Sequence, residues 1–176
     1  MRIVFPDGAG CVRTPADLDP LRRLGEVDFH DGPPADRAEL IARVRPADAI
    51  VLDYSVLDAE VLGHCDRLRF ISFLGIGYAS CIDVAEATRR GIVIANTPDY
   101  GATSVAEHAL GMVLALTRHI GAGFASMREG RWEPGRFQGI ELRGQTLGLM
   151  GLGPIGMEMA RLGAGIGLQL RGRARR

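Results

Sequence analysis

Short β-branched apolar runs alternate with longer amphipathic segments through the first hundred residues. This alternation is typical of βα units that build a parallel sheet. Strands are expected at Arg2–Pro6, Glu26–Phe29, Ala49–Leu52, Leu68–Phe73 and Ile92–Ala95. Helices are expected between them at Ala16–Leu24, Ala35–Val44, Leu57–Cys65 and Val84–Arg90. The pattern predicts an open, doubly wound α/β sheet, in which ligands bind at the carboxyl ends of the strands.

The βα rhythm stops at residues 98–101, and a long apolar segment follows at Val105–His119. Its composition leaves little polar surface, so we expect a helix that is buried between layers or domains. The next segment, Gly121–Gly144, is rich in glycine, arginine and aromatic residues, and we expect loops and turns there. The long helix is therefore expected to connect two parts of the chain.

Polar residues near the start of that helix suggest structural roles. Ser104 and Glu107 have the spacing of a capping box, in which each side chain satisfies a backbone N–H. For His108, a buried and hydrogen-bonded imidazole is the favoured interpretation over acid/base catalysis, because nothing nearby in the sequence pairs with it.

A glycine motif follows a second strand-like run, Thr146–Met150. In a G-x-G-x-x-G turn the first glycine (Gly151) makes the tight turn, and the second (Gly153) lets the backbone approach a pyrophosphate. The third (Gly156) lets the helix pack closely on the strand. Pro154 falls at the first helical position, where its missing N–H costs nothing. This context favours a dinucleotide-binding turn over a plain strand–helix turn.

A second glycine pair, Gly75 and Gly77, flanks Ile76 directly after a predicted strand. At the ligand end of the sheet, such a segment can turn consecutive backbone N–H groups toward a carboxylate. An ordinary βα turn would have the same sequence, so both interpretations stay open at this point.

Composition narrows the classes of partner. Basic and acidic residues balance at 21 each, which gives no electrostatic reason to expect nucleic acid or an anionic membrane as a partner. No apolar run reaches the roughly 18 residues of a membrane span, and the N-terminus is typical of a first strand, so we expect a cytoplasmic protein.

The three cysteines lack C-x-x-C spacing, so neither a disulfide framework nor a metal site is expected. Every basic residue is arginine, which excludes chemistry that needs a lysine, such as a P-loop or a Schiff base.

Five blocks of the sequence resemble the D-isomer-specific 2-hydroxyacid dehydrogenases and follow that family's order and spacing. The family includes phosphoglycerate dehydrogenases and glyoxylate or hydroxypyruvate reductases. The blocks are Gly75–Tyr78, Ile82–Ile92, Asn96–Tyr100, Ser104–His108 and Glu141–Gly156. The resemblance implies an NAD(P)-dependent oxidoreductase that moves hydride between the nicotinamide and a small 2-hydroxy or 2-oxo acid. It also implies a homodimer for an intact member of the family.

The resemblance further implies a domain plan. Residues 1–100 would form a flavodoxin-like substrate domain that lacks its C-terminal returning segment, and residues 101–120 would form a connecting helix. Residues 121–176 would begin a truncated Rossmann domain for NAD or NADP, with its first βα unit. In this plan the bound acid and the cofactor meet in the cleft between the two domains.

Site residues follow from the same resemblance. Ile76 and Gly77 would donate backbone N–H groups to the substrate carboxylate. The full substrate set is Gly75, Ile76, Gly77 and Tyr100, and the full cofactor set is Thr103, Gly151, Gly153, Pro154, Ile155 and Gly156. The family's catalytic Arg, Glu and His lie downstream of the matched region, so no catalytic residue is assigned, and we expect this chain to be inactive on its own.

The last seven residues depart from the family pattern. A Rossmann domain usually carries an Asp or Glu that binds the adenosine ribose about twenty residues after the first glycine, but this chain has no acid after Glu158. The arginines there could hold the 2′-phosphate of NADP. However, Arg171 and Arg173 fall where a buried apolar strand is expected, and unpaired buried charges are costly. We therefore expect a truncated or frameshifted end.

Two other functions remain open. The chain could be a non-enzymatic fragment that binds nucleotide or assembles with intact subunits. It could also be a regulatory flavodoxin-like domain that folds without nucleotide.

Overall fold

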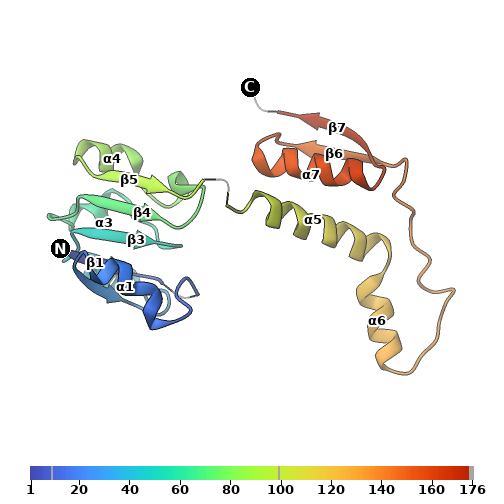
Figure 1. The fold of residues 1–176 in the computed structure, drawn as a ribbon, viewed down its shortest axis with the longest axis horizontal. Helices are drawn as coiled ribbons and strands as arrows, with labels where there is room; N and C mark the ends of the chain where they lie inside the picture. Colours follow the sequence, from blue (N-terminus) through green and yellow to red (C-terminus); the bar gives the residue numbers. More distant parts are fainter. Residues whose placement is uncertain (9, 99, 175–176) are drawn as a thin grey trace. The chain divides into compact units, whose positions relative to one another are not determined.

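The computed structural model describes residues 1–8, 10–98 and 100–174. The chain divides into two compact units, Met1–Pro98 and Asp99–Arg176, which we call unit 1 and unit 2. Figure 1 shows the elements of both units, and each unit is described by itself.

Unit 1 is built on one parallel sheet of five short strands. The strands are β1 (Arg2–Phe5), β2 (Glu26–Phe29), β3 (Ala49–Leu52), β4 (Phe70–Phe73) and β5 (Val93–Asn96). Their order is β2-β1-β3-β4-β5, and every neighbouring pair is parallel. This is the strand order of the flavodoxin-like fold, whose direction of winding reverses between β1 and β3. The expected doubly wound parallel sheet is confirmed.

Short helices connect these strands. They are η1 (Pro15–Leu18), α1 (Asp19–Arg22), α2 (Arg37–Val44), α3 (Ala59–Gly63), η2 (Tyr78–Ser80) and α4 (Val84–Arg89), where η marks a 3₁₀ helix. An aspartate caps three of them: Asp36, Asp58 and Asp83 each accept the N–H of the residue three positions later. Such caps satisfy donors that the first helical turn leaves unpaired, which explains why α2, α3 and α4 begin where they do.

The strand pleat divides the core of unit 1 between the two faces of the sheet. Val4 and Ile50 lie in a cluster with residues of α2, α3 and α4. Their neighbours Ile3 and Ala49 lie in a second cluster with Leu18 of η1. Successive side chains of a strand point to opposite faces, so helices cover both faces and the carboxyl edge of the sheet is left for loops.

Unit 2 contains a parallel strand pair with a helix between the strands. Its elements are α5 (Ala102–Thr117), α6 (Ile120–Arg128), β6 (Thr146–Met150), α7 (Pro154–Gly165) and β7 (Gln169–Arg173). β6 and β7 pair from Thr146 opposite Gln169 to Met150 opposite Arg173. Helix α5 packs on α7, and Figure 1 shows α7 running along the two strands. This β6–α7–β7 segment is the expected start of a Rossmann-type fold.

Four expectations for the first part of unit 2 are wrong. Helix α5 begins at Ala102 with Gly101 as its N-cap residue, so Ser104 and Glu107 lie inside the helix and do not form a capping box. His108 is exposed, and Ala106 is the one buried residue among the 16 of α5, so the apolar composition did not mean burial within this chain. α6 forms where we expected loops, because nine residues without proline allow a helix despite two glycines.

The C-terminal strand also differs from expectation. β7 forms with Arg171 and Arg173 in it, and all five of its residues are exposed, so the strand does not bury either charge among the described residues. Arg175 and Arg176 lie outside the described residues.

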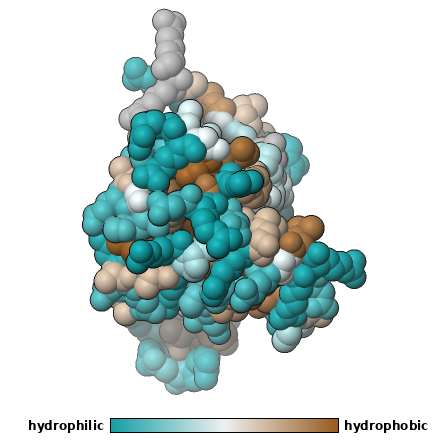
Figure 2. Space-filling view, turned by 90° about the vertical axis from the view of Figure 1, so that its left-hand side faces the viewer, coloured by the Kyte–Doolittle hydropathy of each residue, from teal (hydrophilic) through white to brown (hydrophobic). Residues whose placement is uncertain are grey.

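Among the described residues, no single helix is long and apolar enough to cross a membrane. The adjacent helices α5 and α6 reach the required length and composition only as a pair, and they are bent by 61°. Figure 2 shows a face of the molecule that is mostly hydrophilic, with small separate hydrophobic areas. Scattered apolar residues of this kind are normal on protein surfaces.

Candidate functional site

Loops that follow four parallel strands gather at the carboxyl edge of the unit 1 sheet. The Gly75–Gly77 loop follows β4 and lies next to the end of β5. Its carbonyl groups are tied down: Thr97 N–H donates to Gly75 O at 3.1 Å, and Asn96 Nδ2 donates to Ile76 O at 3.0 Å. The loop is therefore held from the neighbouring strand through its acceptors.

Two backbone N–H groups of this loop are free to bind a ligand. The N–H groups of Ile76 and Gly77 have no acceptor among the described residues, and Ile76 is 39% exposed. Neither glycine adopts a left-handed φ, and Gly77 caps the start of η2. Gly75 is needed for packing, because a Cβ there would come within 2.7 Å of the Phe73 ring. Adjacent unpaired amides at a sheet edge can bind a carboxylate.

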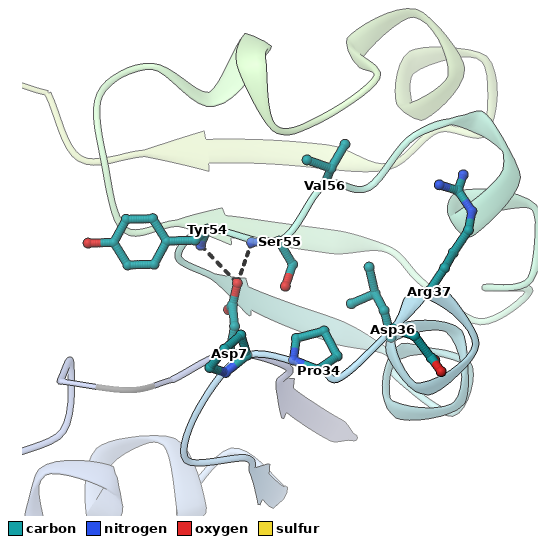
Figure 3. A pocket seen from close by; sticks show the side chains of 9 residues that line it. Asp7, Pro34, Asp36, Arg37, Tyr54, Ser55 and Val56 are labelled. Atoms are coloured by element: carbon teal, nitrogen blue, oxygen red, sulfur yellow. Dashed lines mark hydrogen bonds between the residues drawn. The ribbon is translucent and has the colours of Figure 1, made fainter.

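A second loop, residues 53–56, follows β3 and is held by Asp7. Asp7 comes shortly after β1, and it is 2% exposed. Its carboxylate accepts the backbone N–H groups of Asp53 at 3.2 Å, Tyr54 at 2.8 Å and Ser55, and Figure 3 shows the bonds from Tyr54 and Ser55. Asp7 was not identified from the sequence. An acidic residue that follows a central strand at the ligand edge was the available signal.

The carboxyl group of Asp53 lies close enough to Asp7 to be affected by it. Burial raises the pKa of Asp53, and the charge of Asp7 raises it further. A raised carboxyl pKa means that the folded state holds its proton more tightly than the unfolded state. This residue's contribution to stability is therefore present below its unfolded pKa of about 3.9 and is lost as pH rises through the folded value.

We expect Asp53→Asn to raise the Tm at pH 7, because it removes a carboxylate that is costly in the folded state at that pH. The difference from wild type should shrink as pH falls toward about 3.9, where wild-type Asp53 becomes protonated. Thermal unfolding between about pH 3 and pH 7 checks this. A Tm difference that stays constant over that range would show that the charge of Asp53 is not responsible.

The glycine turn of unit 2 has the geometry that a dinucleotide requires. Gly151 has φ +105°, which residues with side chains rarely adopt, and its N–H donates to Arg173 O at 2.9 Å. A Cβ on Gly156 would lie 2.1 Å from Gly151 O, whereas a Cβ on Gly153 would meet nothing within 4 Å. Gly151 therefore allows a tight turn, Gly153 leaves the backbone open to a ligand, and Gly156 allows the helix to pack closely on the turn.

The open space at Gly153 lies at the start of α7. Pro154 occupies the first turn, and Gly153 caps the helix without a side-chain hydrogen bond. Met157 is the first residue whose N–H bonds within the helix, to Gly153 O at 2.9 Å. The N–H groups of Ile155 and Gly156 have no acceptor among the described residues. Free amides at the positive end of a 12-residue helix fit a pyrophosphate.

The remaining residues that the resemblance implied are exposed. Tyr100 is 64% exposed, and Thr103 lies exposed in the first turn of α5. Both belong to unit 2 with the glycine turn, whereas Gly75–Gly77 belong to unit 1. No group of three or more His, Cys, Asp or Glu residues that could hold a metal ion occurs within residues 1–8, 10–98 and 100–174.

A ribose-binding acid is not found at the end of β7. The last acidic residue of the chain, Glu158, pairs with Arg161 at 2.7 Å on α7. Arg173 ends β7 beside the glycine turn. Among the described residues, the end of β7 thus offers no carboxylate for a ribose.

Comparison with known proteins agrees with this geometry. The family description "D-isomer specific 2-hydroxyacid dehydrogenase, catalytic domain" matches residues 10–165. D-3-phosphoglycerate dehydrogenase of Archaeoglobus fulgidus is 42% identical over 146 residues, which are 82% of this chain and 27% of that protein. Glyoxylate reductase of Pyrococcus furiosus is 39% identical over 142 residues, 76% of this chain and 42% of that protein. The chain thus spans between about a quarter and two fifths of these relatives.

A solved structure shows the same fold. The TT0316 protein of Thermus thermophilus superposes with a TM-score of 0.89 at 31% identity, over 100% of this chain and 57% of that one. Solved structures of this fold include an acyclic imino acid reductase with NADPH and a formate dehydrogenase with NAD. The family uses NAD or NADP. On its sequence and its fold, the chain belongs to the D-isomer-specific 2-hydroxyacid dehydrogenases.

Proposed function

We propose that this chain supplies the acid-binding loop and the pyrophosphate-binding turn of an NAD(P)-dependent 2-hydroxyacid dehydrogenase. The geometry of the glycine turn carries the proposal. Gly151, Gly153 and Gly156 each meet a different steric demand, and these are the three demands of a dinucleotide turn. A plain strand–helix connection would not need the second glycine, whose missing side chain leaves open space.

The substrate is a small 2-oxo or 2-hydroxy acid in this proposal. The N–H groups of Ile76 and Gly77 hold its carboxylate, and Asn96 and Thr97 hold the loop that presents them. Two neutral donors fix orientation without a buried counter-charge. The names of the relatives include phosphoglycerate and glyoxylate, and the substrate class of this chain is the acid group that these compounds share.

When bound, the nicotinamide would donate hydride to a 2-oxo carbon or accept it from a 2-hydroxy carbon. The residues of this chain bind and orient: the first-turn amides of α7 hold the pyrophosphate, and Thr103 and Tyr100 would line the nicotinamide and substrate sides. No residue of this chain is assigned the proton transfer. The chain itself can therefore be tested for binding of the acid and of the nucleotide.

A second candidate function is assembly with another subunit. Several large apolar side chains of unit 2 are more than half exposed: Met112, Leu116, Ile120, Phe124, Met127 and Trp132. Three of them follow at helical spacing on α6, which is how a helix presents an apolar face to a partner. Association with a second family subunit, as the resemblance implies, would cover this surface.

Replacing Asn96 with aspartate is expected to weaken acid binding by roughly tenfold. The change removes the bond to Ile76 O and places a negative charge beside the amides that would hold a carboxylate. Like charges at close range cost about 1 kcal/mol even in water. The measurement is a titration of ¹⁵N-labelled chain with glyoxylate, followed at the Ile76 and Gly77 amides.

Asn96→Ala is the matched control, because it removes the same hydrogen bond without adding charge and should weaken binding less. Unchanged affinity in Asn96→Asp would contradict the acid site. So would a wild-type titration that shifts neither the Ile76 nor the Gly77 amide.

A further inference from the structure

A pocket of about 600 Å³ lies on unit 1 at the start of helix α2. It is formed by Asp7, by parts of residues 33–40 and by residues 54–56. In Figure 3, Ser55 and Val56 lie above Pro34 and Asp36, so the two segments enclose the pocket from opposite sides. Its volume falls in the range of about 300–1,000 Å³ that is typical of sites for small organic molecules.

Most of the pocket wall is apolar. Pro33, Pro34, Leu40 and Val56 supply this part of the lining. Leu40 is buried, whereas Val56 is 52% exposed, so apolar surface of the pocket is in contact with water. Covering such surface is favourable. The body of a ligand that fits this pocket is therefore apolar.

The charges at the pocket are mostly negative. Asp7 and Asp36 line it, and their hydrogen-bond donors in the described part of the chain are all backbone N–H groups. Arg37 also lines the pocket, but its Nη2 pairs with two carboxylates, those of Asp58 and Glu60. Its positive charge is therefore more than balanced, and the pocket favours a cation over an anion.

Two oxygen atoms of the lining can accept a hydrogen bond from a ligand. Asp36 uses Oδ1 to cap α2, where it accepts Glu39 N–H at 2.8 Å, and its Oδ2 has no donor among the described residues. The Ser55 backbone N–H donates to Asp7, while the Ser55 hydroxyl has no partner within residues 1–8, 10–98 and 100–174. A carboxylate oxygen that is free in this way binds an ammonium group by a charge-assisted hydrogen bond.

This pocket is separate from the acid-binding loop. Its lining comes from the chain that follows β1, β2 and β3 and from the start of α2, whereas the Gly75–Gly77 loop follows β4. None of the lining residues belongs to the Gly75–Gly77 loop. A carboxylate held by the Ile76 and Gly77 amides and a cation held in the pocket would therefore occupy different places.

We propose that this pocket binds an organic amine with an apolar body, such as an arylalkylamine. The ammonium group bonds to Oδ2 of Asp36, and the apolar body lies against Pro33, Pro34 and Val56. The site is additional to the acid and nucleotide sites proposed above and does not depend on either of them.

The test compares three probes on the ¹⁵N-labelled full chain: 2-phenylethylamine, 2-phenylethanol and 3-phenylpropionate. They carry the same ring and the same two-carbon spacer, and they differ in whether the end group is positive, neutral or negative. We expect 2-phenylethylamine to shift the amides of Arg37, Leu40, Ser55 and Val56 at the lowest concentration. The alcohol should bind there more weakly, and the carboxylate most weakly.

Asp36→Asn tests the role of the charge. Asparagine caps a helix about as well as aspartate does, so α2 should keep its start while the negative charge is lost. We expect roughly tenfold weaker binding of the amine and unchanged binding of the alcohol. Asp83→Asn is the matched control, because Asp83 caps α4 by the same bond, to Glu86 N–H at 3.0 Å, and does not line the pocket. It should alter neither affinity.

A second measurement needs no variant, so it holds even if Asp36→Asn does not fold. Raising the ionic strength from about 0.01 M to about 0.15 M shortens the Debye length from about 30 Å to about 8 Å. In the unaltered chain this should weaken binding of 2-phenylethylamine and leave binding of 2-phenylethanol unchanged.

Several outcomes would contradict the proposal. Equal affinities for the amine and the alcohol, or tighter binding of 3-phenylpropionate at the pocket amides, would overturn the assignment of a cationic ligand. Amine shifts that avoid Arg37, Leu40, Ser55 and Val56 would overturn the site. Displacement of the amine by glyoxylate would show that the pocket is not separate from the acid site. A glyoxylate titration that leaves the Ile76 and Gly77 amides unchanged, beside normal amine binding, would overturn the acid site alone.

Discussion

Replacing Gly156 with alanine is expected to destabilise unit 2 by about 3 kcal/mol. The new Cβ would lie 2.1 Å from Gly151 O, and the clashing atom belongs to the backbone of the turn, so a side-chain rotation cannot relieve it. Overpacking of this kind costs about 1–3 kcal/mol, and here the upper end applies because β6 and α7 must separate. Hydrogen exchange of the β6 amides measures the loss.

Strand β4 of unit 1 is the internal control in the same sample, and its exchange should not change. Gly165→Ala is the matched variant, because Gly165 also lies in α7 and a Cβ there meets nothing within 4 Å. If Gly156→Ala were as stable as Gly165→Ala, the close approach of helix and turn would be wrong.

Replacing Gly153 with alanine is expected to weaken nucleotide binding by roughly tenfold or more, with almost no change in stability. Gly153 has φ −76° and ψ −172°, which alanine adopts freely, and its Cβ would enter open space. That space lies at the start of α7, where the pyrophosphate must approach the backbone. A tenfold loss of affinity is about 1.4 kcal/mol. Isothermal titration with NADH and NADPH measures it.

The two glycine variants should therefore lose nucleotide binding for different reasons. Gly156→Ala loses binding because the turn no longer holds its shape, whereas Gly153→Ala stays folded and loses binding because the approach is blocked. Full nucleotide affinity in a folded Gly153→Ala would contradict the assignment of this glycine.

The sheet of unit 1 was predictable because its strands are short apolar runs between clear helix starts. Glu26–Phe29 and Ala49–Leu52 were predicted with the bounds that the structure shows. Asp36 and Asp58 cap α2 and α3 through local hydrogen bonds, although the helices predicted there, from Ala35 and from Leu57, begin two residues too early. Local signals of this kind act within a few residues, so one sequence is enough to recognise them.

The start of unit 2 was harder to predict for two reasons. The N-cap residue Gly101 has no side chain to form a capping box, so α5 begins earlier than Ser104 suggested. Composition also does not say what covers an apolar helix: Leu116 is 76% exposed in this chain. Burial of such a helix depends on neighbours, which periodicity alone does not reveal.

The candidate site also contains some residues that could be recognised from the sequence and others that could not. The glycines were recognisable because their spacing reflects backbone geometry, as the φ of Gly151 and the contact at Gly156 show. Asp7 and Asn96 were missed because their partners lie 46 to 48 and 20 residues away. Such pairings arise only when the sheet brings the ends of separate strands together.

Binding of a dinucleotide at the glycine turn underlies the whole assignment of unit 2. Titration of the unaltered chain with NADH and NADPH, followed at the amides of Ile155 and Gly156, measures that binding at the turn itself. We expect saturable shifts at these two amides with at least one of the nucleotides, and their loss in Gly153→Ala. A chain whose β6 and α7 amides are protected from exchange, yet whose Ile155 and Gly156 amides respond to neither nucleotide, would contradict it.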